Sequence, residues 1–322
     1  MGRAVCRGWG DKVAVRALVR GVAERVLCAL PRRTNPGDRL ILAYHNVVPA
    51  GWVPRGDRSL HLPIDKFEAQ LRLIRREAEI VPLMELLTTD APNDRRVAIT
   101  FDDAYASALT LGVGACVAAG AACTVFVAPG LLGTVPYWDR AADAGAWSEA
   151  ERGLFLWEHA GYGDAETLAM SSATPSDSLL QLATADALRA AAGGAGVAIG
   201  NHTMRHGNLG ALGNDAVCAE VSAADAWLRA FAPQAMVPVL AYPFGIAPKA
   251  PGTAIPAACV TWGARVTGGW MSEEPVTAPF ALARWNVPAG ITTAGFTARV
   301  RGRLTGRKSP NEVGLDQQPR GK

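Results

Sequence analysis

Two adjacent carboxylates and two closely spaced histidines are the side chains of this sequence that are best arranged for chemistry. Asp102 and Asp103 stand at the end of one apolar run, and His202 ends another, with His206 four residues further on. Two histidines and one carboxylate form a ligand set that leaves room for water on a hydrolytic metal ion. Non-haem iron oxygenases use the same set, so the ligands alone do not decide the reaction.

Each motif also has a purely structural interpretation. The Asp-Asp pair, taken by itself, favours the N-cap of a helix that starts at Ala104. The H-x3-H spacing places both histidines on one face of a helix, where they can bind one ion, but many helix surfaces show the same spacing. The context favours a metal site, because the chain has five histidines and two of them form this motif directly after an apolar run.

Seven short apolar runs rich in β-branched residues predict the strands that must position these side chains. Helical patterns between several of them, such as 64–79, predict a mostly parallel sheet, either open or closed into a barrel. Active sites of such folds lie at the carboxyl ends of the strands, and the motifs stand there. The runs are 39–45, 97–102, 123–128, 197–202, 237–242, 258–266 and 281–287.

The remaining segments predict the organisation of the chain. We expect a basic amphipathic helix in 1–37, a catalytic domain in 38–300 and a disordered basic tail in 301–322. The segment 134–192 is too long for a simple crossover, and its aromatic clusters predict a partly helical insertion. Asn214 or Asp215 is expected to cap the helix that follows the histidine motif.

Composition and charge exclude some classes of protein. The chain of 322 residues is 49% hydrophobic and 19% charged, which excludes a disordered chain. Its net charge of +3 combines +6 in residues 1–39 and +5 in residues 299–322 with −8 between them. The basic ends indicate attraction to an anionic surface such as phospholipid, or are two solvated tails. We expect no nucleic-acid partner.

The first thirty residues predict a location. Arg16, Arg20, Glu24 and Arg25 interrupt the apolar stretch that a secretory signal requires. The six cysteines form no C-x-x-C pair, and they fit a reducing compartment. We therefore expect a cytoplasmic protein, with peripheral association at the inner membrane face as an extension of that prediction. The apolar positions recur at helical spacing, so this helix either lies on a membrane surface or packs on the domain. They are Val15, Leu18, Val22, Val26 and Ala29.

Three motifs in a fixed order resemble the polysaccharide deacetylase family with the NodB homology domain, similar to carbohydrate esterase family 4. They are T-F-D-D-A-Y (100–105), H-T-M-R-H (202–206) and A-Y-P-F-G (241–245). Flanking segments such as Y-W-D-R (137–140) and A-R-W-N-V (283–287) are similar as well, so that the resemblance covers roughly residues 38–290. It implies a distorted (β/α)7 barrel of mostly parallel strands and metal-dependent removal of N-acetyl groups from amino sugars.

The resemblance also implies roles for individual residues. Asp102 matches the catalytic base. The matched metal ligands are Asp103, His202 and His206, with zinc as the expected ion and cobalt, nickel or manganese as alternatives. The segment that supplies a backbone N–H to the oxyanion matches Tyr242, Pro243, Phe244 and Gly245.

The chain departs from the family pattern at three places. Ala104 replaces a glycine, and Ala241 replaces the arginine that often accompanies the base, for which Arg284 is a candidate substitute. No histidine follows His206, so the late general acid of many members is absent. A branch that acts on poly-N-acetylglucosamine draws this acid from an early Tyr-His strand end, which His45 matches. The alternative for His45 is a neutral histidine bonded to the backbone.

The sequence thus predicts a metal-dependent carbohydrate N-deacetylase. Its substrate would be an N-acetylated glycan or glycolipid, either a surface exopolysaccharide or its lipid-linked precursor. One alternative is an amidohydrolase that acts on a non-sugar N-acyl compound with the same site. A second alternative is an inactive glycan-binding protein, against which the full Asp-Asp and H-x3-H set argues because binding needs no catalytic base. The sequence predicts no oligomeric state.

Overall fold

One parallel sheet organises the protein. The computed structural model describes residues 19, 21–31, 38–89, 94–144, 177–264 and 279–302. In these ranges the sheet has the strand order β10-β1-β5-β6-β7-β8-β9, and β4 also pairs with β5. The strands are β1 (Arg39–Tyr44), β4 (Glu79–Ile80), β5 (Arg96–Phe101), β6 (Cys123–Val127), β7 (Val197–Asn201), β8 (Met236–Ala241), β9 (Trp262–Ala264) and β10 (Trp285–Asn286).

The sheet curls into a distorted barrel. β10 pairs with β1 at one end of the strand order, and an isolated parallel bridge joins Ala264 of β9 to Leu282, just before β10. The segment 282–286 thus spans the gap between the two edges. Without the short β4, seven strands form the wall, which confirms the predicted (β/α)7 barrel. The last two strands are shorter than predicted, because turns and a 3-10 helix (Pro279–Ala281) occupy the flanks of the apolar runs.

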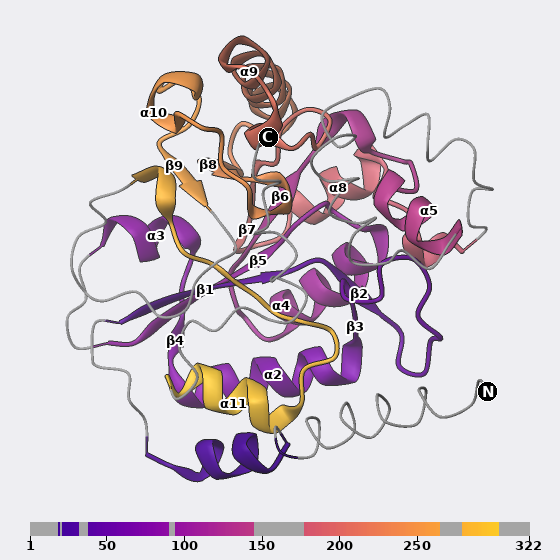
Figure 1. Ribbon diagram of the computed structural model, residues 1–322, viewed down its shortest axis with the longest axis vertical. Helices are drawn as coiled ribbons and strands as arrows, with labels where there is room; N and C mark the ends of the chain where they lie inside the picture. Colours follow the sequence, from indigo (N-terminus) through magenta and orange to yellow (C-terminus); the bar gives the residue numbers. More distant parts are fainter. Residues whose placement is uncertain are drawn as a thin grey trace, which may run out of the picture.

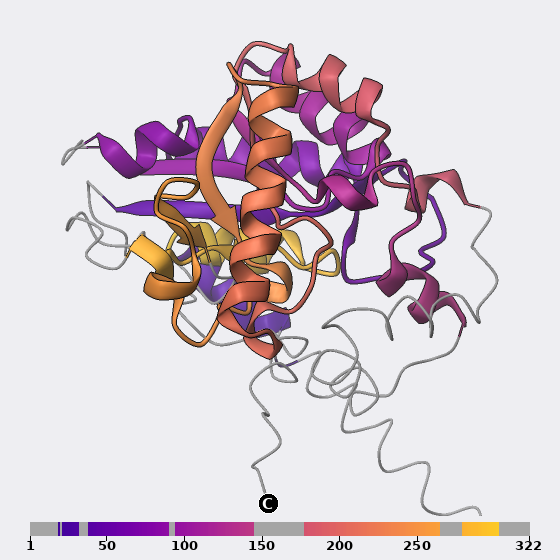
Figure 2. The ribbon, with the colours of Figure 1, turned by 90° about the horizontal axis from the view of Figure 1, so that it is seen from above.

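Helices cover the outside of the sheet. Figure 1 shows α2 and α11 on one side of the sheet, and α9 and α10 on the other. Viewed from above in Figure 2, α9 runs across the face of the molecule beside the long arrow of β8. The helices are α2 (Ile64–Glu77), α3 (Leu83–Thr88), α4 (Gly114–Ala118), α5 (Tyr137–Ala144), α8 (Ala185–Ala192), α9 (Asn214–Phe231), α10 (Pro251–Ala254) and α11 (Thr293–Val300). A further helical segment covers residues 21–29.

The helix predicted after the histidine motif is present, but its cap is different. Gly213 is the N-cap of α9, with no side-chain cap bond, so the predicted capping by Asn214 or Asp215 is wrong. Glycine adopts the extended N-cap conformation readily, and Asn214 becomes the first helical residue. The predicted apolar face is buried, as Val217, Val221 and Leu228 show.

Both faces of the barrel strands are buried, which explains their unbroken apolar runs. Inward-facing side chains such as Ile41, Ala98 and Phe126 form one cluster inside the barrel. Their strand neighbours, such as Leu40 and Val97, belong to a second cluster between the sheet and the helices. The rigid wall between these two clusters fixes the positions of the strand ends.

Two segments outside the barrel matter for the site. The strands β2 (Asn46–Val48) and β3 (His61–Pro63) form a small parallel sheet next to the end of β1. Of the predicted insertion, the structure describes 134–144 and 177–192, and the rest of it lies outside the described residues, as does the predicted tail from 303 on. None of the described helices is long and apolar enough to span a membrane.

Candidate active site

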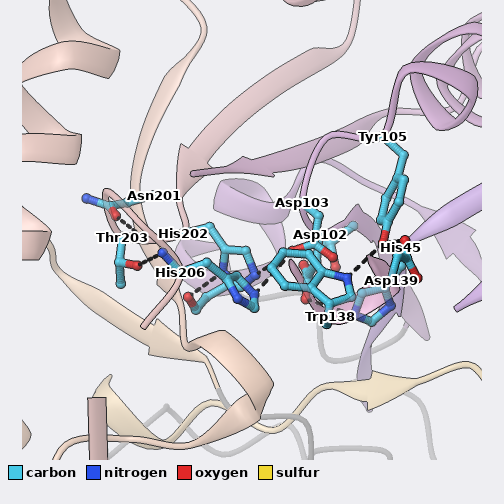
Figure 3. A network of polar contacts seen from close by, with 12 residues as sticks. His45, Asp102, Asp103, Tyr105, Trp138, Asp139, Asn201, His202, Thr203 and His206 are labelled. Carbon is cyan, nitrogen blue, oxygen red and sulfur yellow. Dashed lines mark hydrogen bonds and ion pairs between the residues drawn. The ribbon is translucent and has the colours of Figure 1, made fainter. Parts of the chain in front are cut away.

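Three strand ends deliver the predicted site residues to one rim of the barrel. His45 directly follows β1, Asp102 and Asp103 follow β5, and His202 follows β7. Figure 3 shows these side chains converging from both halves of the barrel, with His206 beside them. Both carboxylates and the last two histidines are buried, whereas the His45 side chain is 14% exposed.

Asp103, His202 and His206 form a compact triad. The Oδ1 atom of Asp103 lies 3.4 Å from Nε2 of His202 and 3.2 Å from Nε2 of His206. Their ligand atoms all lie within 4.8 Å of one another, the separation expected of ligands around one ion. Nδ1 of His202 lies 2.7 Å from the carbonyl oxygen of Ala241. Because a carbonyl oxygen only accepts hydrogen bonds, Nδ1 carries the proton. Nε2 of a neutral His202 therefore has a free lone pair.

The triad fits a divalent cation. Asp103 Oδ1 is buried and has no hydrogen-bond donor within the described part of the chain. It faces the Nε2 atoms of two imidazoles in a buried site, and Nε2 of a neutral His202 offers a lone pair and no donor. Such a cluster is costly unless a positive charge lies between its atoms. The two-histidine, one-carboxylate donor set suits zinc and similar ions.

The histidine motif is a loop, not a helix. Thr203 and His206 have φ angles of 63° and 59°, in the left-handed region that side chains other than glycine rarely adopt. The Asn201 side chain accepts a hydrogen bond from the Thr203 N–H at 2.8 Å, and the Thr203 hydroxyl accepts one from the His206 N–H at 3.0 Å. The prediction that His202 and His206 meet on a helix face is therefore wrong. The loop brings them together with strained backbone that these bonds support.

Asp102 has a different environment from its neighbour. Its Oδ1 and Oδ2 accept hydrogen bonds from Nη1 and Nη2 of Arg284, at 2.7 and 2.9 Å. Arg284 is fully buried, and it lies just before β10 with its guanidinium against the Phe126 ring. Arg284 thus pairs with Asp102 in the role that Ala241, which has no charged side chain, cannot fill. The two adjacent carboxylates are separated, because Asp103 leaves the strand conformation with a φ angle of 69°.

The charges around the two aspartates keep both ionised. Burial alone would raise the pKa of Asp102, but Arg284 and the nearby imidazoles of His202 and His45 hold it below the usual value. Burial is likewise outweighed at Asp103, where His206 and His202 lower the pKa strongly. Both carboxylates therefore accept hydrogen bonds or a cation near neutral pH.

The two histidines of the triad respond differently to the same surroundings. Burial lowers the pKa of each imidazole. At His202 the carboxylates of Asp103 and Asp102 outweigh burial, and the pKa is raised. At His206 burial prevails and the pKa is lowered, which favours the neutral imidazole that a metal requires.

His45 lies at the entrance of the site. Its Nε2 is 4.0 Å from Oδ2 of Asp102, beyond hydrogen-bond distance but close enough for attraction between charges. Its side chain is more exposed than those of the triad, so it can reach a molecule that enters from solvent. From this position the His45 imidazole could give a proton to a departing group.

The turn 242–245 contributes one backbone N–H that finds no acceptor among the described residues. Tyr242 donates its N–H to Ala264, and Gly245 donates its N–H to Tyr242. Pro243 has no N–H. The Phe244 N–H is thus the one in this turn for which the described residues show no acceptor. Phe244 has a φ angle of 57°, so the turn holds this residue in a sparsely populated conformation.

Aromatic rings enclose the triad. The Trp138 ring lies 4.3 Å from the His206 ring, and the Phe244 ring lies 4.7 Å from it on another side. The Tyr137 hydroxyl donates to the carbonyl oxygen of His206 at 3.0 Å, which ties α5 to the histidine loop. The aromatic residues predicted for the insertion thus include two that line the site. Trp147, Phe155, Trp157 and Tyr162 lie outside the described residues.

A buried polar network that the sequence did not predict supports this wall. Asp139 is fully buried; its Oδ2 accepts the Tyr105 hydroxyl at 2.7 Å, and its Oδ1 lies 3.3 Å from Nε2 of His61. The Trp138 indole N–H donates to the Tyr105 oxygen at 2.8 Å. The only sequence signal was the Y-W-D-R segment, which does not show what Asp139 contacts. Glu220 of α9 is a second missed residue, because it accepts the Arg205 N–H at 2.8 Å and steadies the histidine loop.

Comparison with known families agrees with this geometry. The family model described as polysaccharide deacetylase matches residues 89–256, a stretch that includes both aspartates, the histidine motif and the turn. The chain belongs to the polysaccharide deacetylase family. For this deacetylase, no curated protein gives a significant sequence match.

Solved structures share the fold of this deacetylase at low sequence identity. The Streptococcus pyogenes deacetylase PplD, solved with acetate, is 16% identical, with a TM-score of 0.58 over 83% of this chain and 99% of that one. BC0361, a polysaccharide deacetylase from Bacillus cereus, is 12% identical, with a TM-score of 0.59 over 82% and 69%. A de-N-acetylase from Aggregatibacter actinomycetemcomitans is 11% identical, with a TM-score of 0.57 over 83% and 100%.

Proposed function

We propose that this deacetylase is a metal-dependent hydrolase that removes N-acetyl groups from amino sugars of a surface polysaccharide or its lipid-linked precursor. The observation that carries the proposal is the division between two adjacent carboxylates. Asp103 faces two imidazoles, an environment that suits a metal ligand. Asp102 faces a guanidinium, which keeps a carboxylate ionised and suits a general base. Binding a glycan requires neither arrangement.

The triad would hold the cation. Asp103, His202 and His206 offer one oxygen and two nitrogen atoms, and zinc is the ion we propose, with cobalt, nickel or manganese as alternatives. When bound, such an ion supplies Lewis acidity, which makes the amide carbonyl more electrophilic and lowers the pKa of water. The bond from His202 Nδ1 to Ala241 keeps that ring oriented toward the ion.

Asp102 would act as the general base. Each of its oxygens accepts one N–H of Arg284, and each keeps a second lone pair for a proton. Asp102 takes a proton from the attacking water as the new carbon–oxygen bond forms. Arg284 keeps the carboxylate ionised and oriented before that transfer, so that it acts through Asp102.

The Phe244 N–H and His45 would complete the reaction. As the carbonyl oxygen gains negative charge, the Phe244 N–H is available to donate to it, an effect worth about 3–4 kcal/mol per donor in other enzymes. His45 gives a proton to the amide nitrogen as the carbon–nitrogen bond breaks. One water is consumed, and the products are acetate and a free amine.

The amino-sugar substrate is supported by the walls of the site and by the relatives. Trp138 and Phe244 present aromatic surface beside His206, and such surface packs well against sugar rings. One structural neighbour is a de-N-acetylase. The alternative, a non-sugar N-acyl substrate, uses the same reacting groups and differs only in what these walls contact.

Acetate release tests the proposal. The purified protein is incubated with oligomers of N-acetylglucosamine and, separately, with N-acetyl amino acids, with and without a chelator. We expect acetate from the oligomers only, and we expect the chelator to stop its release. Release from the amino acids alone would favour the amidohydrolase. Binding of the oligomers without acetate release would favour an inactive glycan-binding protein.

The choice between a finished polymer and a lipid-linked precursor depends on the location of the enzyme. The cytoplasmic location expected from the sequence stays a prediction. Fractionation of cells that express the full chain, with immunodetection in the cytosolic, membrane and extracellular fractions, tests it. Recovery in the extracellular fraction would contradict the prediction.

A further inference from the structure

The helical segment 21–29 is attached to the barrel by a polar side chain. Glu24 is 5% exposed, and its Oε2 accepts the Thr292 hydroxyl at 2.6 Å. The glutamate carboxyl rests on Gly295 of α11, where an added Cβ would lie 2.9 Å from its carbon atom. The contact therefore depends on a small residue in α11 and on a buried, hydrogen-bonded acid.

A second polar contact holds the end of the segment. The carbonyl oxygen of Cys28 accepts a hydrogen bond from Nη1 of Arg301 at 2.6 Å. Nη2 of the same arginine pairs with Glu77 of α2 at 2.9 Å. Figure 1 shows the indigo helix lying beside the yellow α11. These bonds orient the segment, so that one defined face of it points away from the protein.

The outward face is apolar. Large hydrophobic side chains at 19, 22, 26 and 30 follow helical spacing and share one stripe. Within the described residues six large hydrophobic side chains are exposed, and four of them belong to this stripe. The apolar face of a surface helix normally packs on the core; here it faces solvent. The exposed fractions are 62% for Val19, 55% for Val22, 58% for Val26 and 39% for Leu30.

The segment that carries the stripe belongs to a basic stretch of the sequence. Residues 1–39 contain nine Lys and Arg residues against three acids, and one of those acids, Glu24, is buried in the contact with α11. Arg25 is exposed on the segment itself. The bond from Arg301 to Cys28 also brings the start of the second basic stretch, 299–322, to this place. The remaining residues, 40–298, have a net charge of −8, so the positive charge of the sequence is concentrated in its two end segments.

We propose that the valine stripe, formed by Val19, Val22, Val26 and Leu30, docks on an anionic phospholipid bilayer. An apolar stripe flanked by arginines is the pattern of helices that lie in the interfacial plane. The side chains of the stripe enter the acyl boundary while the arginines contact lipid phosphates, and each basic group adds to the attraction. A protein groove for this helix would need no excess of positive charge at both ends of the chain. The inference is independent of the proposed function.

Co-sedimentation with vesicles tests the docking surface. The full chain is mixed with phosphatidylglycerol vesicles or with phosphatidylcholine vesicles, at low and at high salt. We expect strong binding to phosphatidylglycerol at low salt, weaker binding at high salt because the charges are screened, and little binding to phosphatidylcholine. The double variant Val22→Ser/Val26→Ser should bind about tenfold more weakly, since two apolar side chains no longer enter the bilayer.

Matched variants separate the stripe from general effects. Val53→Ser/Val117→Ser changes two valines that are exposed elsewhere, and it should bind like the wild type. Thermal unfolding and acetate release in solution should be unchanged in both double variants. Binding of the stripe variant at wild-type strength would overturn the proposal, and so would no binding by the wild type. A concentration-dependent dimer that the stripe variant abolishes, without vesicle binding, would assign the stripe to a second copy of the chain and would also overturn it.

Discussion

Arg284 holds both oxygens of Asp102 across 182 positions of the chain. The pair is buried, and its two bonds of 2.7 and 2.9 Å are parallel and charge-assisted. Burial of a carboxylate next to a second one would otherwise favour protonation. The arginine reverses this preference, so the ion pair keeps Asp102 ionised beside the triad of Asp103, His202 and His206.

Asp102→Asn should stop turnover without removing the metal. The amide accepts one N–H of Arg284 through its oxygen but takes no proton from water, so we expect turnover to fall about 100- to 10,000-fold. The variant should also unfold about 3 kcal/mol more easily, because the arginine charge loses its partner. Steady-state kinetics, metal analysis and denaturant unfolding measure the three effects. Asp65→Asn, at an exposed position of α2, is the control. Near-normal turnover in Asp102→Asn would place the base elsewhere.

Arg284→Gln should move the acidic limb of the pH–rate profile to higher pH. Asp102 must be ionised to accept a proton, so activity falls as the pH drops through its pKa. Removing the guanidinium leaves burial as the main influence, which raises that pKa. Arg284→Lys keeps the charge but not the paired bonds, and its limb should lie between those of the wild type and Arg284→Gln. An unchanged limb in Arg284→Gln would mean that Asp102 is not the titrating base.

Each ligand of the triad should be required for the metal. Asp103→Ala, His202→Ala and His206→Ala should each lose stoichiometric metal and activity, because two remaining ligands hold a divalent ion poorly. Elemental analysis of the purified variants measures the metal, and circular dichroism checks that the barrel is intact. His61→Asn changes a buried histidine outside the triad and should retain the ion. Full metal content in all three alanine variants would refute the site.

His45→Gln should slow the hydrolysis of amides more than that of activated esters. An amine leaves only if it is protonated, whereas a nitrophenolate ion leaves without a proton. We expect about a 100-fold lower turnover on N-acetylglucosamine oligomers and little change on nitrophenyl acetate. The ratio of the two rates is the measurement. An equal loss on both substrates would assign His45 to binding or structure instead of proton donation.

Asp139→Ala should destabilise the protein, because it removes the buried acceptor that supports the aromatic wall of the site. The Tyr105 hydroxyl and the Asp57 N–H would lose a buried acceptor, which costs about 2–4 kcal/mol in the free energy of unfolding. Asp186 of α8 pairs with Arg189, but its side chain is 95% exposed. The matched variant Asp186→Ala should therefore change the free energy of unfolding by less than about 0.5 kcal/mol. Denaturant unfolding compares the two, and equal stabilities would show that the buried network contributes little.

Much of the barrel and the placement of its motifs could be predicted from the sequence. Strands buried on both faces need unbroken apolar runs, and such runs are visible without a structure. Parallel strands bring their carboxyl ends to one rim, so the placement of His45, Asp102 and His202 together followed from their positions after three runs. The type and order of these residues also indicated the family and predicted the group of Asp103, His202 and His206 that could hold a metal ion.

Other features were decided only by the tertiary structure. The sequence named Arg284 only as a candidate partner for Asp102, and the strand order decided the pairing, because only β1 lies between β10 and β5. The conformation of 202–206 depended on bonds to Asn201 and Thr203, where helical spacing had suggested a helix.

The amphipathic segment near the N-terminus is the clearest example of a feature that the sequence pattern alone did not decide. Its periodicity identified an apolar face but not what that face contacts. The fit of Glu24 against Gly295 turned the polar side inward and left Val22 and Val26 exposed. Local spacing determines which side chains share a face, because the backbone repeat is local. Which face is buried depends on the surface that the rest of the chain presents to it, and that surface exists only in the folded protein.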